Sequence, residues 1–296
     1  MANFDRLIGW WPWRRAAKPS EELGKDGPLT AMVIVAHPDD AEFSCAGTVA
    51  KWVEQGWTVY YVLATSGDKG THDPALTPQE LAALREQEQR DACRVLGVKE
   101  VVFLAYQDGF LRADAEFRGQ IVRLLRRFRP DVVLTWDGFR AGFNHSDHRA
   151  VGIAVRDAVY PAVRDHLYYP QDKDDGLEAH RVNEMLLIGS EDRDYDVDIS
   201  GQIEKKLEAV LCHRSQLGDR SPEEVRRAWQ QRMGASRNGR QVESFKWVRI
   251  RRAQRPQQQP AEGAAAQEKP AEGAAAQEPA PPVPAGQAGT TGQAPQ

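Results

Sequence analysis

Short apolar runs alternate with amphipathic stretches from about residue 29 to residue 250. The apolar runs predict buried strands at 29–36, 57–64, 100–104, 132–136 and 182–188. Between them, apolar residues recur at three- and four-residue spacing, as on one face of a helix, which predicts helices through 46–53, 78–96, 117–128, 151–159 and 203–211. Strands that alternate with helices indicate βαβ units. We therefore predict a Rossmann-like α/β sandwich with a mainly parallel sheet in a single domain.

The two ends of the chain do not follow this pattern. Residues 1–28 contain Trp10, Trp11 and Trp13 beside two arginines, but lack the apolar core and small-residue cleavage site of a signal peptide. They are also too short to span a bilayer. We expect the tryptophans either to pack on the domain surface or to make weak contact with a membrane surface or a partner.

Residues 253–296 are rich in Ala, Pro, Gln and Gly, and the run from Pro260 to Glu268 recurs from Pro270 to Glu278. Such a segment buries too little apolar surface to offset its ordering entropy, so we expect a disordered tail. The predicted organisation is an N-terminal extension at 1–28, one domain at 29–252 and the tail at 253–296.

Composition narrows the range of partners and compartments. The formal net charge of −4 is too small to favour binding to nucleic acid or acidic lipid, so no nucleic-acid partner is expected. The three cysteines are widely spaced and form no CxxC pair, which is typical of reduced thiols in a cytoplasmic protein. The sequence leaves a homo-oligomer open.

Two motifs of histidine and aspartate residues follow the first and the fourth predicted strands. The first strand leads into Ala36-His37-Pro38-Asp39-Asp40, where a dinucleotide-binding protein would carry G-x-G-x-x-G. The fourth leads into His145-Ser146-Asp147-His148. Neighbouring parallel strands end at the same edge of a sheet, so the two loops can meet there. Two histidines and a carboxylate would form a catalytic zinc site with a position left open for water.

The spacing within each motif suggests how the work is divided. His37 and Asp40 are three residues apart, so a tight turn can aim both at a metal while Asp39 accepts a proton. Of His145 and His148, one can ligate while the other donates a hydrogen bond to a developing oxyanion, and Asp147 can hold a histidine in the required tautomer. Taken alone, each motif could be a helix cap or a polar helix start, but together they favour a site.

The two motifs resemble those of the LmbE/PIG-L family of zinc-dependent N-deacetylases. The resemblance covers about residues 30–217 and extends through Thr65-Ser66-Gly67-Asp68, Arg85-Glu86-x-Glu88, Leu96-Gly97 and His213-x-Ser215-Gln216. It implies a Rossmann-like fold and removal of acetyl groups from N-acetylglucosamine-type substrates, here a small amino-sugar conjugate.

The same resemblance implies roles for individual residues. It assigns His37, Asp40 and His148 as zinc ligands, Asp39 as the general base, and His145 as the oxyanion-stabilising residue that Asp147 orients. A site of two histidines and one aspartate also accepts iron, so Fe²⁺ is the alternative to Zn²⁺. Two alternatives to a deacetylase stay open: a hydrolase of another bond at this metal site, and a catalytically silent sugar-binding protein.

Further residues are candidates for contacts with the substrate. Arg85 either pairs with Glu88 on one helix face or binds sugar hydroxyls, as an arginine here does in the family. Asp108 follows the third strand, and it either accepts hydrogen bonds from sugar hydroxyls or is a plain turn residue before a glycine. His213 either approaches the site or caps the last helix. Some family members have a tyrosine where this chain has Phe143, which cannot donate a hydrogen bond to an oxyanion.

Overall fold

A seven-stranded sheet forms the centre of the structure, a computed structural model that describes residues 23–24, 27–71, 73–233 and 240–250. The strand order is β3-β2-β1-β4-β5-β7-β6. The strands are β1 (Thr30–Val35), β2 (Thr58–Thr65), β3 (Glu100–Tyr106), β4 (Val132–Trp136), β5 (Glu184–Ile188), β6 (Tyr195–Asp198) and β7 (Val242–Arg249). The first five pair in parallel, whereas β7 runs antiparallel to both β5 and β6. The predicted Rossmann-like, mainly parallel sheet is confirmed.

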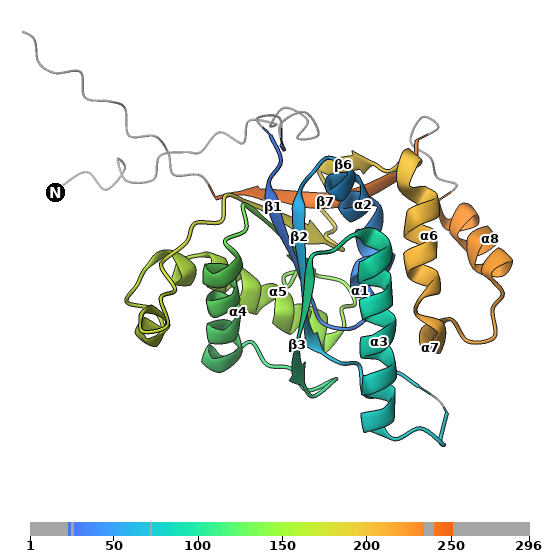
Figure 1. Cartoon of the computed structure of the whole chain (residues 1–296), viewed down its shortest axis with the longest axis horizontal. Helices are drawn as coiled ribbons and strands as arrows, with labels where there is room; N and C mark the ends of the chain where they lie inside the picture. The colour runs from blue at the N-terminus through green and yellow to red at the C-terminus, as the bar shows by residue number, and fades with distance from the viewer. Residues whose placement is uncertain (1–22, 25–26, 72, 234–239, 251–296) are drawn as a thin grey trace, which may run out of the picture. The chain divides into compact units, whose positions relative to one another are not determined.

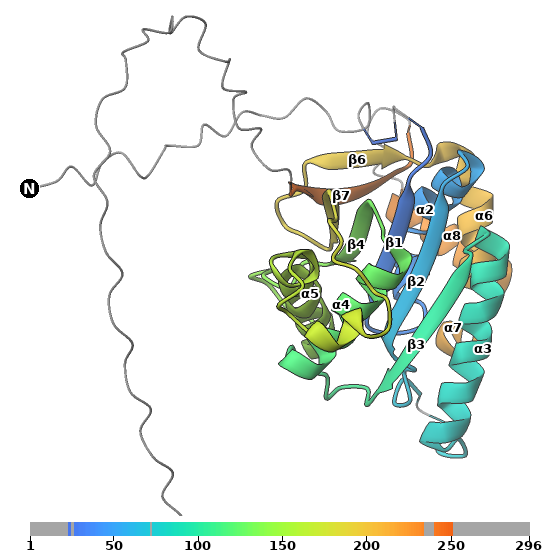
Figure 2. The same ribbon diagram turned by 60° about the vertical axis from the view of Figure 1, so that its left-hand side comes forward.

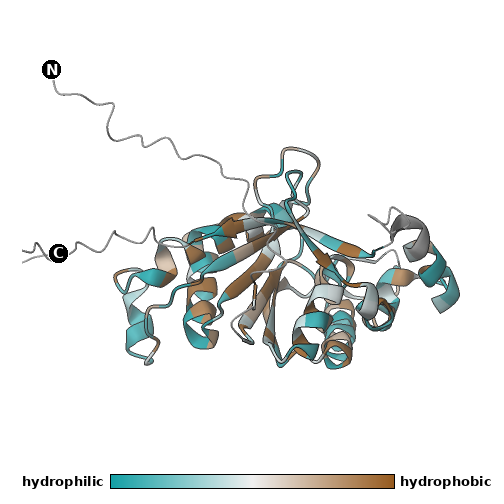
Figure 3. Cartoon of the chain, turned by 90° about the horizontal axis from the view of Figure 1, so that it is seen from above, coloured by the Kyte–Doolittle hydropathy of each residue, from teal (hydrophilic) through white to brown (hydrophobic). Residues whose placement is uncertain are grey.

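Helices cover both faces of this sheet (Figures 1 and 2). One face packs against α2 (Ala46–Glu54), α3 (Pro78–Leu96) and α6 (Ile203–Leu211), and the other against α4 (Ala115–Phe128) and α5 (Ser146–Val159). The apolar strands lie between the helices, whose polar residues are on the outside (Figure 3). The remaining helices and 3₁₀ turns are α1 (Asp40–Ser44), α7 (Arg214–Leu217), α8 (Pro222–Met233), η3 (Ala162–Arg164), η4 (Pro170–Lys173) and η5 (Ser200–Gln202).

Helix α3 begins and ends where the sequence predicts, because its end signals are strong. Thr77 and Glu80 form a capping box in which each side chain bonds the other's backbone N–H, and Pro78 occupies the first turn. Gly97 ends the helix with a φ of 79°, a conformation that glycine adopts without strain. The helix therefore has a fixed register, which determines which of its side chains face the sheet edge.

Strand β7 was not predicted, although its buried residues alternate as in a half-buried strand. One of the inward positions is Glu243, which hides the apolar pattern. Its carboxylate accepts the backbone N–H groups of Gly47 (3.0 Å) and Thr48 (2.7 Å) at the start of α2, and Lys206 donates to it at 2.5 Å. The buried charge is thus compensated by a helix N-terminus and an ion pair.

The N-terminal tryptophan cluster and the C-terminal tail lie outside the described residues, so the domain boundaries at 28 and 252 stay predictions. Within the described part of the chain, no helix combines the length and the apolar character needed to cross a membrane.

Candidate metal and catalytic site

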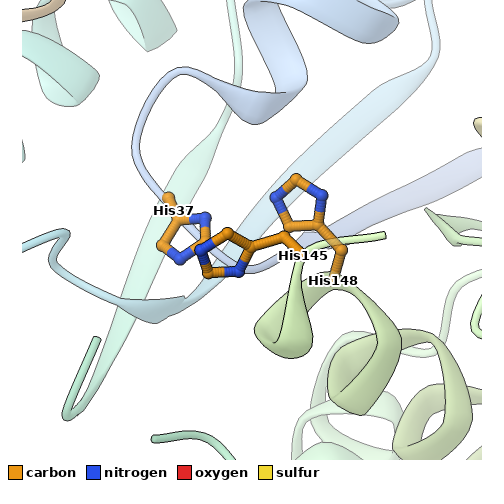
Figure 4. Close-up of side chains that lie close together, drawn as sticks. All are labelled: His37, His145 and His148. Atoms are coloured by element: carbon orange, nitrogen blue, oxygen red, sulfur yellow. The ribbon is translucent and has the colours of Figure 1, made fainter. Parts of the chain in front are cut away.

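The two histidine motifs meet at the point where the strand order changes direction. Strands β1 and β4 are neighbours, with β2 and β3 on one side of them and β5 on the other. His37 follows β1, while His145 and His148 lie at the start of α5, after β4. The three imidazole rings lie close together (Figure 4), and one nitrogen of each is within 4.8 Å of the others. Such a switch point is where open α/β sheets place their ligand sites.

Asp40 joins two of these histidines. Its Oδ1 is 3.1 Å from Nε2 of His148, and its Oδ2 is 3.6 Å from Nδ1 of His37. Burial favours the protonated carboxyl, but the charge of His148 and hydrogen bonds from both histidines outweigh it and hold the pKa of Asp40 well below its usual range. The structure therefore brings together the predicted ligands His37, Asp40 and His148, with the carboxylate ionised.

Backbone and aromatic groups fix this carboxylate and its partner. The Oδ2 of Asp40 accepts the backbone N–H of Ala36 (3.1 Å) and of His37 (2.9 Å), and the indole N–H of Trp136 (3.1 Å). The same indole stacks on His148, with ring centroids 4.0 Å apart. Trp136 thus orients two predicted ligands from the end of β4, a role that the sequence did not indicate.

The far side of the His37 ring faces two more carboxylates. Its Nε2 is 3.1 Å from Oδ1 of Asp108 and 3.3 Å from Oδ2 of Asp147. In a neutral ring, a carboxylate on Nε2 fixes the proton there, and Nδ1 is then the nitrogen that can bind a cation beside Asp40. Burial alone lowers the pKa of His37, but Asp108, Asp147 and Asp40 together raise it to about 12. Such a concentration of negative charge around an imidazole fits a site for a divalent cation.

Two groups of donor atoms are close enough to hold a metal ion in the described part of the chain: His37 with His145 and His148, and His37 with Asp108 and Asp147. The first group contains two of the three predicted ligands, His37 and His148, and its third member is His145 instead of Asp40. Asp40 contacts both His37 and His148, so the predicted set and the three-histidine set lie at one location. They differ in whether the third ligand is Asp40 or His145.

His145 is the N-cap of α5, and its Nδ1 accepts the backbone N–H of Asp147 at 3.2 Å. A neutral ring bonded in this way carries its proton on Nε2 and can donate it. Burial first, and then the charges of His37 and His148, lower the pKa of His145, which favours the neutral form. This is the form expected of a hydrogen-bond donor to an oxyanion.

Asp147 contacts His145 through its backbone and not through the carboxylate that was predicted to orient the ring. The backbone N–H of Asp147 contacts His145, whereas the buried carboxylate lies on His37 and accepts the N–H groups of Gly109 (2.7 Å) and Leu111 (3.3 Å). Asp108 likewise faces His37 and is 7% exposed, so its predicted contact with sugar hydroxyls stays a prediction.

Asp39 forms polar contacts with helix α3. Its carboxylate lies 3.3 Å from the Nη2 of Arg85, and its backbone N–H donates to Oε1 of Gln89 at 3.1 Å. Burial and the neighbouring charge of Asp40 raise the pKa of Asp39 to about 7, although Arg85 and His213 pull it down. A carboxyl with such a pKa can accept and return a proton near neutral pH.

Arg85 reaches the site but is occupied by protein groups. It is 4% exposed and donates to the backbone carbonyls of Pro38 (2.6 Å) and Gly67 (3.0 Å) as well as to Asp39. The alternative pair with Glu88 does not form, because Glu88 accepts the N–H and hydroxyl of Ser215. Binding of sugar hydroxyls by Arg85 stays a prediction.

His213 is buried next to this cluster, and the helix-cap interpretation is wrong. Its side chain makes no cap hydrogen bond, and its Nε2 lies 3.1 Å from Oε2 of the fully buried Glu42. Burial lowers the pKa of His213, but the hydrogen bond to Glu42 and the charges of Glu42, Asp39 and Glu88 outweigh it and raise the pKa.

We expect this pair to make stability depend on pH. A histidine whose folded pKa is raised binds more protons in the native state, so its contribution is complete below its ordinary pKa of 6.5 and is lost as the pH rises through the folded value. The thermal midpoint of the metal-free protein should therefore fall from pH 6.5 upward, and His213→Asn should flatten that slope. The exposed His166 supplies the control, since His166→Asn should leave the slope unchanged; equal slopes in all three proteins would contradict the assignment.

Comparison with known proteins places both motifs in a recognised region. Residues 32–159 match the family described as PIG-L, GlcNAc-PI de-N-acetylase. The diacetylchitobiose deacetylase of Thermococcus kodakarensis is 34% identical over 199 residues, which cover 67% of this chain and 73% of that protein. The 1D-myo-inositol 2-acetamido-2-deoxy-alpha-D-glucopyranoside deacetylase of Actinosynnema mirum is 25% identical over 231 residues, 64% of this chain and 81% of that protein.

A solved structure agrees with these sequence matches. The N,N'-diacetylchitobiose deacetylase from Pyrococcus horikoshii has a TM-score of 0.71 and 28% sequence identity, over 84% of this chain and 94% of that chain.

Proposed function

This chain belongs to the PIG-L family, and we propose that it is a metal-dependent hydrolase that removes the acetyl group from an N-acetylated amino sugar of the N-acetylglucosamine type, or from a conjugate of one. Its relatives carry names of deacetylases whose substrates share N-acetylglucosamine and differ in the attached group. We propose zinc as the metal, with iron as the alternative, since two imidazoles and one carboxylate suit either.

One observation carries the proposal: Asp39 is a largely buried carboxylate next to Asp40 that forms its ion pair with Arg85 and none with His37 or His148. A protein that only bound a sugar through a metal would have no use for such a group. A hydrolase needs one, since a base must accept a proton from the attacking water. Burial next to Asp40 tunes Asp39 for that task.

The residues would act in sequence on a bound acetamide. A divalent cation held by His37, Asp40 and His148 would lower the pKa of water and polarise the acetyl carbonyl. Asp39 takes a proton from the attacking water. The Nε2–H of His145 donates to the carbonyl oxygen as negative charge develops there. Asp39 then returns its proton to the leaving nitrogen, which gives acetate and a free amine.

We expect the purified, zinc-loaded protein to release acetate from N-acetylglucosamine conjugates, with one free amine formed for each acetate. A panel of N-acetylglucosamine, diacetylchitobiose and an N-acetylglucosaminyl inositol measures this directly, and the corresponding glucosamine compounds are the matched controls. Phosphate release from a phosphoester without acetate release would favour hydrolysis of another bond. Binding of the panel without any turnover would favour the silent sugar-binding protein.

A further inference from the structure

Asp39 has an unusual backbone conformation for the residue that must move the proton. Its φ of 99° and ψ of −26° lie in a region that residues other than glycine rarely adopt. It stands at the N-cap position of α1, yet its side chain makes no capping hydrogen bond. The Asp39 side chain therefore does not stabilise this conformation by capping α1, and side chains of neighbouring elements help to hold it.

Helix α3 provides the contacts that hold this turn. Arg85 and Gln89 are four residues apart and lie on the same face of the helix. Arg85 donates to the carbonyl of Pro38 at 2.6 Å and to the carboxylate of Asp39 at 3.3 Å. Gln89 accepts the backbone N–H of Asp39 at 3.1 Å. The two side chains thus bind the carbonyl oxygen and the N–H of one peptide group, the one that joins Pro38 to Asp39.

Gln89 is itself fixed from behind. Its Nε2 donates to Oε1 of Glu42 at 3.0 Å, and Oε2 of Glu42 lies 3.1 Å from Nε2 of His213. All three side chains are 0% exposed. An ionised carboxylate can only accept hydrogen bonds and a backbone N–H can only donate, so the amide of Gln89 has one orientation that satisfies both of its neighbours. A wrongly turned amide would leave two buried polar groups unpaired.

We propose that Gln89, supported by Glu42 and His213, is a positioning residue that holds the general base Asp39 in its strained conformation. The proposal rests on the proposed function, because it assumes that Asp39 is the base. Gln89 makes no hydrogen bond to His37 or His148, so its effect should fall on the proton-transfer step and not on the retention of the metal.

The test is Gln89→Met, which keeps the length of the side chain and removes both hydrogen bonds. We expect kcat to fall about 10- to 100-fold, as for a catalytic group displaced by about 1 Å. KM and the bound metal per chain should stay within about twofold of wild type, because sugar and metal contacts are untouched. Gln87→Met is the matched control, because Gln87 lies on the same helix and is exposed. Its side chain donates a hydrogen bond to Asp91, outside the site, so kcat should not change.

A charge-conserving exchange provides a rescue that a general loss of stability could not imitate. In the double variant Glu42→Gln with Gln89→Glu, the carboxylate accepts the N–H of Asp39 and the new amide bridges it to His213. This variant should regain most of the kcat lost in Gln89→Met. Wild-type kcat in Gln89→Met, or a double variant that binds metal fully but is as slow as Gln89→Met, would overturn the inference. Full activity of Asp39→Asn would instead overturn the proposed function.

Discussion

Replacing Asp39 by asparagine is expected to lower kcat by about 10²- to 10⁴-fold, the range of a lost general base. Asparagine has nearly the same size and tolerates a positive φ, so the turn before α1 should keep its shape. It carries no negative charge and cannot accept the proton of the attacking water. Alanine at this position should be at least as slow, because it also removes the contact with Arg85.

The decisive second measurement is the metal content of the same preparations. Asp39 contacts Arg85 and Gln89, whereas Asp40 contacts both predicted histidine ligands, so Asp39→Asn should bind as much metal as wild type. Asp91, whose side chain is 38% exposed, is the matched control, since Asp91→Asn should change neither kcat nor metal. A fully active Asp39→Asn would remove Asp39 from the mechanism, and an inactive variant without metal would make it a ligand.

Local periodicity was enough to predict most of the fold. The helix over 78–96 appears at those residues because a capping box and a C-terminal glycine mark both of its ends. The parallel strands appear within one or two residues of their apolar runs. Strand β7 escaped prediction because Glu243 occupies an inward position, and only the packed structure supplies Lys206 and the start of α2 to compensate its charge.

For the site, too, the sequence predicts one part and only the packed structure reveals the other. The two motifs could be placed together because parallel strands deliver their ends to one sheet edge, and neighbours within each motif could be assigned by spacing. The residues that contact these motifs are distant in sequence. Trp136 donates a hydrogen bond to Asp40, Asp108 contacts His37, and Gln89 accepts the N–H of Asp39. In the sequence, only the polar character of Gln89, at a position on the buried face of its helix, indicates that this residue has a special role. The sequence does not show which residue it contacts.

His148→Ala is expected to lose the metal and, with it, the activity. The imidazole is 3.1 Å from the buried carboxylate of Asp40 and stacks on Trp136, so its removal takes away one of the two histidines that Asp40 contacts. Replacing a residue that only orients a ligand costs about 10- to 100-fold in metal affinity. Removing a ligand should cost more, whereas Asp108→Asn, which alters one partner of His37, should fall within that range. Metal content after dialysis against a weak chelator measures both.

His145→Ala separates the two possible ligand sets at this location. If His37, Asp40 and His148 bind the metal, His145→Ala should retain it and lose activity, since the donor to the oxyanion is gone and the metal ligands remain. If the three histidines bind it, His145→Ala should lose metal as His148→Ala does. The Nδ1 of His145 already accepts the N–H of Asp147, so only its Nε2 is available, and that atom cannot both ligate a cation and donate a proton. Retention of metal by His145→Ala together with low kcat would therefore assign that nitrogen to the oxyanion, and wild-type metal affinity in His148→Ala would refute the predicted set.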